Sequence, residues 1–98
     1  MAVGDIAADG ASVAAGNYLD IRPGAGVEWV IHNIYYATDV KVHRYKSDAS
    51  VDIAFANRSG GGVFSDYFFH CSNTWYLRVE NNTASAQDIA FDGVVTKA

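Results

Sequence analysis

The chain has 98 residues and a formal net charge of −4 at pH 7, and its length fits one domain of ordinary size. Half of its residues are apolar, and thirty are Val, Ile, Phe, Tyr or Trp, whereas Leu and Glu occur only twice each. Branched and aromatic side chains favour strands over helices. The acidic balance argues against a nucleic-acid-binding protein, because phosphate binding depends on a basic surface.

The single cysteine, Cys71, excludes a disulfide within the chain and indicates folding in a reducing compartment. The first ten residues, MAVGDIAADG, contain no Lys or Arg and no apolar run, unlike a signal peptide. No stretch approaches the roughly 20 apolar residues of a membrane span. We therefore expect a soluble protein that is synthesised in the cytoplasm and does not enter a membrane.

Residues 1–16 differ in composition from the rest of the chain. They contain six Ala, three Gly and no aromatic residue. One interpretation is a short edge strand, or two strands around a turn at Asp9-Gly10. The other is an arm that becomes ordered only against a neighbouring chain, because small residues bury too little area to dock alone. The main domain then covers residues 17–98.

From residue 17 onward, apolar and polar side chains alternate between turn signals such as Pro23-Gly24. We expect strands at residues 18–22, 27–36, 40–46, 51–56, 63–72, 75–80 and 88–96. With an N-terminal strand, this gives seven or eight strands at a spacing of about 10–12 residues. No interval is long and helical enough for a parallel crossover. The sequence therefore predicts an all-β domain, either an antiparallel β-sandwich or a jelly roll.

The alternation also predicts which side chains face the core. In the strand at 51–56, Val51, Ile53 and Phe55 fall on one side, and we expect them to be buried. In the strand at 75–80, Trp75 faces inward and Tyr76 faces outward. The strand at 27–36 is apolar on both faces, so we expect it to be central or buried on both sides.

The chemically reactive residues form no catalytic or metal-binding pattern. Adjacent strand residues point to opposite faces, so His70 and Cys71 cannot chelate one metal ion together. No Cys or His spacing matches a zinc site, and no G-x-S-x-G elbow marks a nucleophilic serine. A lone Cys71 in an aromatic strand is best explained as a packing residue. We predict no catalytic residues, no metal and no cofactor, and therefore not an enzyme.

A short basic cluster lies in the strand at 40–46, where Lys41, Arg44 and Lys46 occur within six residues. The simpler interpretation is a solvated strand face that Asp39 and Asp48 balance. The alternative is a contact patch for an acidic partner surface.

Aromatic side chains are the most informative feature, because one thin sandwich cannot bury all of them on its inward faces. Tyr35 and Tyr36 must point to opposite sides of their strand, and so must Trp75 and Tyr76. Tyr and Trp are enriched at protein interfaces. We therefore expect a homo-oligomer, whose predicted interface residues are Val3, Ile6, Trp29, Tyr35 and Tyr36. Exposed rings also stack on sugars, and Trp75 and Tyr76 are the candidates for that role.

Two runs, GNYLDIRPGAGVEWVIHNIYY and TWYLRVENNTASAQDIAFDGVVTK, together with the short strands between them, resemble small β-sandwich virion proteins of tailed bacteriophages. These include capsid decoration (cement) proteins and related head or tail accessory proteins. The resemblance implies an oligomer, often a trimer, that sits on the outer capsid surface and clamps the major capsid protein. It implies no catalytic residues, synthesis in the host cytoplasm and a final location in the virion. Residues 1–16 would then be a capsid-contacting arm.

A second class of function remains open from the residues themselves. A carbohydrate-binding or host-receptor-binding module of a phage tail or fibre would use Trp75 or Tyr76 as a stacking platform. We expect a virion decoration protein, with this binding module as the alternative.

Overall fold

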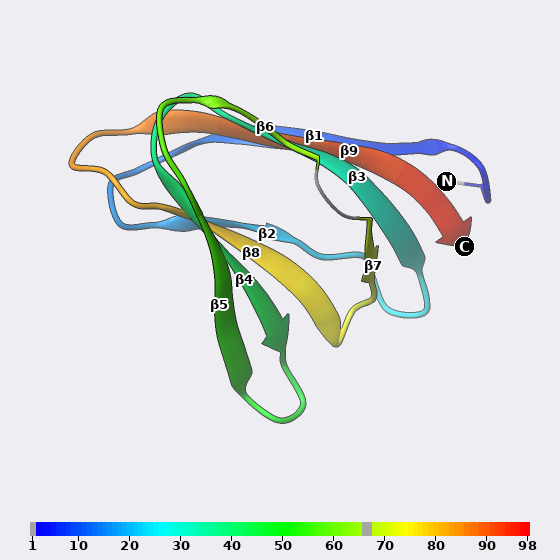
Figure 1. Ribbon diagram of the computed structural model, residues 1–98. Coiled ribbons are helices and arrows are strands. Elements are labelled where there is room, and N and C mark those ends of the chain that lie inside the picture. The colour runs from blue at the N-terminus through cyan, green and yellow to red at the C-terminus, as the bar shows by residue number, and fades with distance from the viewer. Residues whose placement is uncertain (1, 66–67) are drawn as a thin grey trace.

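A computed structural model describes residues 2–65 and 68–98 of the chain (Figure 1). The described residues contain no helix and form nine strands. These are β1 (Ile6–Val13), β2 (Tyr18–Ile21), β3 (Glu28–Tyr36), β4 (Val40–Lys46), β5 (Val51–Arg58), β6 (Gly62–Phe64), β7 (Phe69–Cys71), β8 (Trp75–Asn81) and β9 (Gln87–Lys97).

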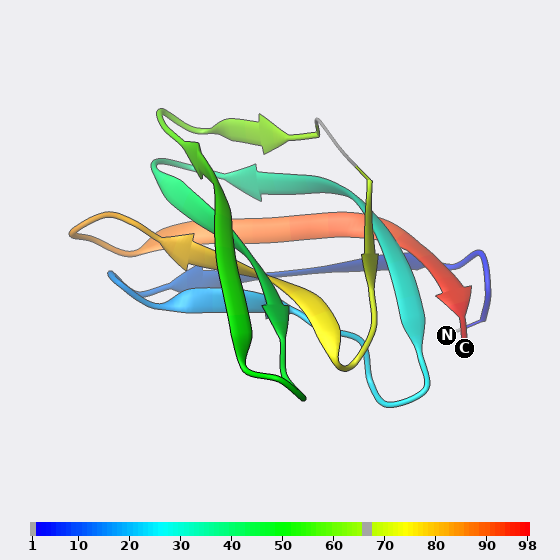
Figure 2. The same ribbon diagram turned by 60° about the horizontal axis from the view of Figure 1, so that its bottom comes forward.

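The strands form two antiparallel sheets that pack face to face (Figures 1 and 2). The first sheet has the order β1-β9-β3-β6, with β7 also paired to β3, and the second has the order β2-β8-β4-β5. The strands of the first half of the chain pair with those of the second half in reverse order, as in one long hairpin. β1 pairs with β9, β2 with β8, β3 with β6 and β7, and β4 with β5. Rolling that hairpin into two layers gives a jelly roll. The predicted antiparallel sandwich is confirmed.

The strand predicted at 63–72 is interrupted and gives β6 and β7, both of which pair with β3. Phe64 lies opposite Ile34 and Phe69 lies opposite Ile31, and neither Ser65 nor Phe68 belongs to a strand. β3 itself has a register shift between Ile31 and Asn33 in its pairing with β9. Residues 66 and 67 of the predicted strand lie outside the described residues.

The N-terminal segment is one continuous strand, and the turn expected at Asp9-Gly10 is wrong. β1 runs through both residues and pairs with β9 along its whole length. Gly10 lies opposite Ala90, where a Cβ on residue 10 would come within 2.9 Å of the Ala90 Cβ. The glycine therefore permits close strand packing and does not form a turn.

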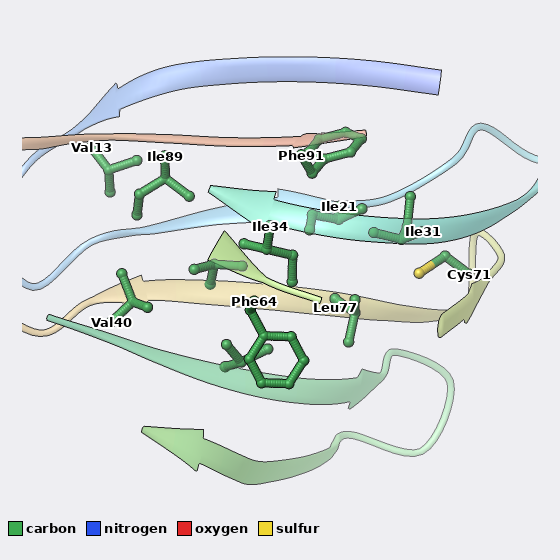
Figure 3. Packing of buried hydrophobic residues seen from close by; sticks show 12 residues of the cluster. Val13, Ile21, Ile31, Ile34, Val40, Phe64, Cys71, Leu77, Ile89 and Phe91 are labelled. Carbon is green, nitrogen blue, oxygen red and sulfur yellow. The ribbon is translucent and has the colours of Figure 1, made fainter. Parts of the chain in front are cut away.

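The core lies between the two sheets, where inward side chains from nearly every strand meet (Figure 3). Ile31 and Ile34 of β3 and Leu77 of β8 have almost no exposed surface. Each such side chain contributes about 1.5–3 kcal/mol on burial. The remaining buried members are Val13, Ile21, Val40, Val42, Phe64, Cys71, Val79, Ile89 and Phe91.

The side chains of β5 that were predicted to be buried point inward as expected, but they are not buried. Val51, Ile53 and Phe55 are 39%, 51% and 39% exposed. β5 is the edge strand of the second sheet, and the β4–β5 hairpin extends away from the first sheet (Figure 1). Its inward side chains therefore have no complete opposing layer, so the sandwich is open at this end.

A buried pair of amide side chains closes the opposite end. The Asn81 Nδ2 donates to the carbonyls of Val13 and Ser85, and the Gln87 Nε2 donates to the Asn81 Oδ1 at 2.9 Å. The Gln87 Oε1 accepts hydrogen bonds from the backbone N–H groups of Ala37 and the next residue. This Asn81–Gln87 pair thus joins β1, β8, β9 and the turn between β3 and β4.

Asn81→Ala is expected to destabilise the fold by about 3 kcal/mol or more, because it leaves several buried backbone and side-chain groups without partners. Equilibrium urea unfolding measures the loss. Asn82→Ala is the matched control, because Asn82 is exposed and its recorded hydrogen bond is made by its backbone N–H. Equal effects of the two substitutions would contradict the role assigned to the buried pair.

Gly93→Ala is expected to destabilise the fold by about 2–3 kcal/mol. A Cβ at Gly93 would press against the Val30 carbonyl oxygen and lie 2.8 Å from the Ile31 Cα, where β3 and β9 approach closely. Gly24→Ala is the control, because a Cβ there meets nothing within 4 Å. Thermal unfolding of both variants tests this, and an unchanged midpoint for Gly93→Ala would refute the close-approach argument.

Candidate interaction surfaces

The outward side of the first sheet is unusually apolar for a surface that faces solvent. The residues of β9 at positions 87, 89, 91, 93 and 95 are buried, so those between them point outward. The strand register places the following apolar residues on this outward side: Ile6, Ala8, Val30, Tyr35, Val63, Ala90 and Val94. We call these seven residues the apolar face. Ile6 is 73% exposed, whereas antiparallel sheets usually present polar side chains to water.

The apolar face is poor in positive charge. In the five strands of this sheet the one Lys or Arg is Lys97, near the end of β9, where it pairs with Glu28. The Asp92 carboxylate accepts hydrogen bonds from the Asn33 Nδ2 at 2.8 Å and from the Tyr35 hydroxyl at 2.7 Å. The hydrogen bond to Asp92 raises the pKa of Tyr35. These neutral donors leave the Asp92 carboxylate charged, and Asp88 also points outward, so the charge on this side of β9 is acidic.

The outward side of the second sheet has the opposite character, since its aromatic rings are covered by arginines. The Arg78 guanidinium lies 3.9 Å from the centroid of Tyr18 and 4.4 Å from that of Tyr45, while it binds both oxygens of Asp20. The surplus of aromatic residues in the sequence is therefore absorbed partly within the chain, by cation–π stacking. On this side Arg78 pairs with Asp20, so both of these charges already have a partner.

The two predicted sugar-stacking residues lie on different sides of β8. Tyr76 faces outward as expected but is only 2% exposed, because Arg22 stacks on its ring and Tyr45 packs beside it. Trp75 is half-buried on the inward side, with the Arg44 guanidinium 4.5 Å from its ring centroid. A sugar could therefore stack on Tyr76 only after Arg22 moved aside.

A groove of about 500 Å³ occupies the open end of the sandwich. Its lining includes Ile53 and Phe55 of β5, Phe69 and His70 of β7, Trp75 of β8 and Arg44 of β4. The Phe55 ring lies 5.3 Å from that of Phe69, so aromatic side chains form much of the wall. We call this the β5 groove. Phe68, whose ring packs against that of His32, also lines the groove.

Arg44 places a positive charge in the β5 groove. It donates hydrogen bonds to the His70 carbonyl and to the Cys71 Sγ. Burial lowers the pKa of the guanidinium from its ordinary value. No Asp or Glu of the described residues forms an ion pair with Arg44. The groove thus combines apolar walls with a cation that has no counter-ion among the described residues.

The three residues of the predicted basic patch do not share one surface. Alternation along β4 puts Lys41 on the outward side of the second sheet and Arg44 and Lys46 on the inward side. Lys46 pairs with Asp48 at 2.6 Å. Of the three, only Arg44 lies in the β5 groove.

The predicted interface residues also divide between two environments. Ile6 and Tyr35 lie together on the apolar face, and Val3 is exposed just before β1. Trp29 and Tyr36 point inward and pack against the core, and the Trp29 ring contacts that of Phe91. The Trp29 Nε1 is buried and finds no acceptor among the described residues.

A bridge centred on His43 could not be predicted from the sequence. The His43 Nδ1 lies 2.8 Å from an Asp52 oxygen of β5, and its Nε2 lies 2.9 Å from a Glu80 oxygen of β8. Both nitrogens can donate only when the ring is protonated. The bridge joins β4 to its neighbours β5 and β8. Residue spacing along the chain does not show that these three strands are adjacent.

Within residues 2–65 and 68–98, no cluster of three or more His, Cys, Asp or Glu residues could hold a metal ion. No helix long and apolar enough to cross a bilayer occurs in the same ranges. Comparison of the sequence with known protein families and with curated proteins gives no match.

The Cys71 thiol is expected to be unreactive toward a thiol reagent such as DTNB in the native protein. It is 1% exposed, and burial raises its pKa, although Arg44 acts in the opposite direction. Only the thiolate reacts, so little reactive species is accessible. Full reaction in guanidinium chloride provides the control, and rapid labelling of the folded chain would contradict the buried position.

Proposed function

We propose that this protein is a structural component of a phage virion, a homo-oligomeric decoration protein that binds the outer capsid surface. The observation that carries the proposal is the apolar face, a solvent-facing sheet surface on which Ile6, Tyr35 and Val63 are exposed, with Asp88 and Asp92 as the charged groups at the outward positions of β9. Such a surface is costly on a monomer and is typical of protein contact sites. The resemblance to virion proteins supplies the biological setting.

The mechanism would be mechanical. Sheet surfaces with small residues, such as Ala8 beside Asp92 and Gly10 beside Ala90, are flat enough to lie closely against a second surface. Burying apolar side chains there stabilises an assembly in proportion to the area removed from water. Each subunit could then join copies of itself and the major capsid protein without any covalent step.

The purified protein is expected to form an oligomer, with a trimer favoured, well above the monomer mass of 10.6 kDa. The double substitution Ile6→Glu and Val63→Glu places two charges on the apolar face and is expected to give monomers, because each charge would have to be buried in the interface. Multi-angle light scattering across a concentration series measures the mass.

Asn57→Glu is the matched control, because Asn57 pairs with Lys41 and lies on the outward side of the second sheet. It adds the same charge as one of the test substitutions, on the opposite surface of the molecule. A wild-type protein that stays monomeric at all concentrations would refute the oligomer. Dissociation by Asn57→Glu, without dissociation by the double substitution, would show that the interface is not the apolar face.

The capsid role requires a separate test. The protein should co-sediment with capsids of the phage that encodes it and raise the temperature at which those capsids release their DNA. The double variant is expected to lose both effects. Capsids that neither bind the protein nor gain stability would contradict the decoration role, whatever the oligomeric state.

A carbohydrate-binding module is the second candidate, and the position of Trp75 in an open groove favours it. Tyr76 is covered, so Trp75 would be the stacking residue. A glycan array with the wild-type protein and Trp75→Ala separates the two functions, since saturable sugar binding without capsid affinity would favour this module.

A further inference from the structure

The β5 groove combines three features that a single type of ligand would satisfy. Its walls expose large apolar side chains, with Ile53 51% exposed. Its wall includes Arg44, a cation that forms no ion pair with any described carboxylate. Its outer rim is β5, an edge strand that pairs only with β4 among the described residues.

An unpaired edge strand offers a row of backbone donors and acceptors to an extended peptide. β5 is eight residues long, which is enough for such pairing. A strand added beside it would have alternate side chains on the inward side of the sheet, next to Val51 and Ile53. The added side chains would then reach the groove.

We propose that the β5 groove binds an extended segment of a partner protein, which adds a strand to β5 and directs apolar side chains and one carboxylate into the groove. The carboxylate meets Arg44, and the apolar side chains cover Ile53 and Phe55. This site lies apart from the apolar face, so it goes beyond the function proposed above, and either can fail without the other.

Two other occupants fit the groove less well. A second copy that paired through its own β5 would bring Val51, Ile53 and Phe55 to the inward side, and none of these could neutralise Arg44. A neutral sugar needs many hydrogen-bonding groups around its hydroxyls. In the described lining only Arg44, His70 and Trp75 carry polar side-chain atoms. An acidic, partly apolar peptide matches both the charge and the walls.

The test uses the full chain and a designed peptide, acetyl-Thr-Ile-Thr-Glu-Thr-Ile-Thr-amide, which places Ile, Glu and Ile on one side of an extended strand. A second peptide carries Gln in place of Glu. Titration followed by amide NMR shifts is expected to perturb β5, including Ile53 and Ala54. The Glu peptide should bind about tenfold more tightly, as expected for a charge-assisted hydrogen bond in a partly buried site.

Arg44→Gln is expected to abolish the preference for the Glu peptide, so that both peptides bind equally weakly. Because Arg44 also contacts His70 and Trp75, Ile53→Thr provides a second variant at an exposed position. It should weaken both peptides about fourfold and keep the preference, because only apolar contact is lost. Lys41→Gln, which removes a charge from the opposite side of the sheet, should change neither affinity.

Several results would overturn the proposal. These are no binding of the Glu peptide at millimolar concentration, shifts confined to strands other than β4 and β5, or an equal preference for Glu in wild type and Arg44→Gln. Cellohexaose serves as the sugar probe. Saturable shifts around Trp75 with cellohexaose, in the absence of peptide binding, would assign the groove to carbohydrate.

Discussion

The two ends of this sandwich differ in how they are closed, because Asn81 and Gln87 form a buried hydrogen-bonded pair at one of them. Asn81 and Gln87 supply amide groups that satisfy backbone carbonyl and N–H groups from three separate segments, at residues 13, 37–39 and 83–85. These segments are distant in sequence, so the pair fixes the spacing of the two sheets where they meet. Buried polar groups that are fully satisfied in this way specify one arrangement of the surrounding chain.

No comparable pair is recorded in the described part of the opposite end, and the difference has consequences for surface chemistry. There the β4–β5 hairpin diverges from the first sheet, and side chains that would otherwise be core line the β5 groove. Arg44 can occupy this region because one face of its guanidinium stacks on Trp75 while its N–H groups bind His70 and Cys71. An inward-pointing guanidinium can remain partly solvated where the opposing sheet is incomplete. Between two complete sheets it would be fully desolvated, which costs free energy.

Sequence reasoning succeeded where the answer depends on local alternation. It gave the fold class and the bounds of most strands, and for β4 the predicted residues 40–46 are those observed. It also placed Ile53 on the correct side of β5. It failed to give the burial of Ile53, because burial depends on whether the other sheet extends far enough to cover that side chain.

The surfaces show the same limit. Ile6 and Tyr35 were predicted as contact residues from their chemical type, but their meeting on one face depends on β9 lying between β1 and β3. Trp29 and Tyr36 have the same chemical character, yet they point inward because the bulge in β3 changes which positions face the core. The His43 bridge likewise depends on strand order, which spacing along the chain does not reveal.

The pairing of β1 with β9 also affects how the protein is made. Ile6 lies beside Val94, so β1 pairs with a strand that is synthesised about 80 residues later. Synthesis proceeds at about 5–20 residues per second, so β1 waits several seconds for its partner. During that time its edge is open to other chains, but its small side chains (mostly Ala, Gly and Ser) make it a poor nucleus for aggregation. The composition of this segment thus suits a strand that cannot pair until β9 has been synthesised.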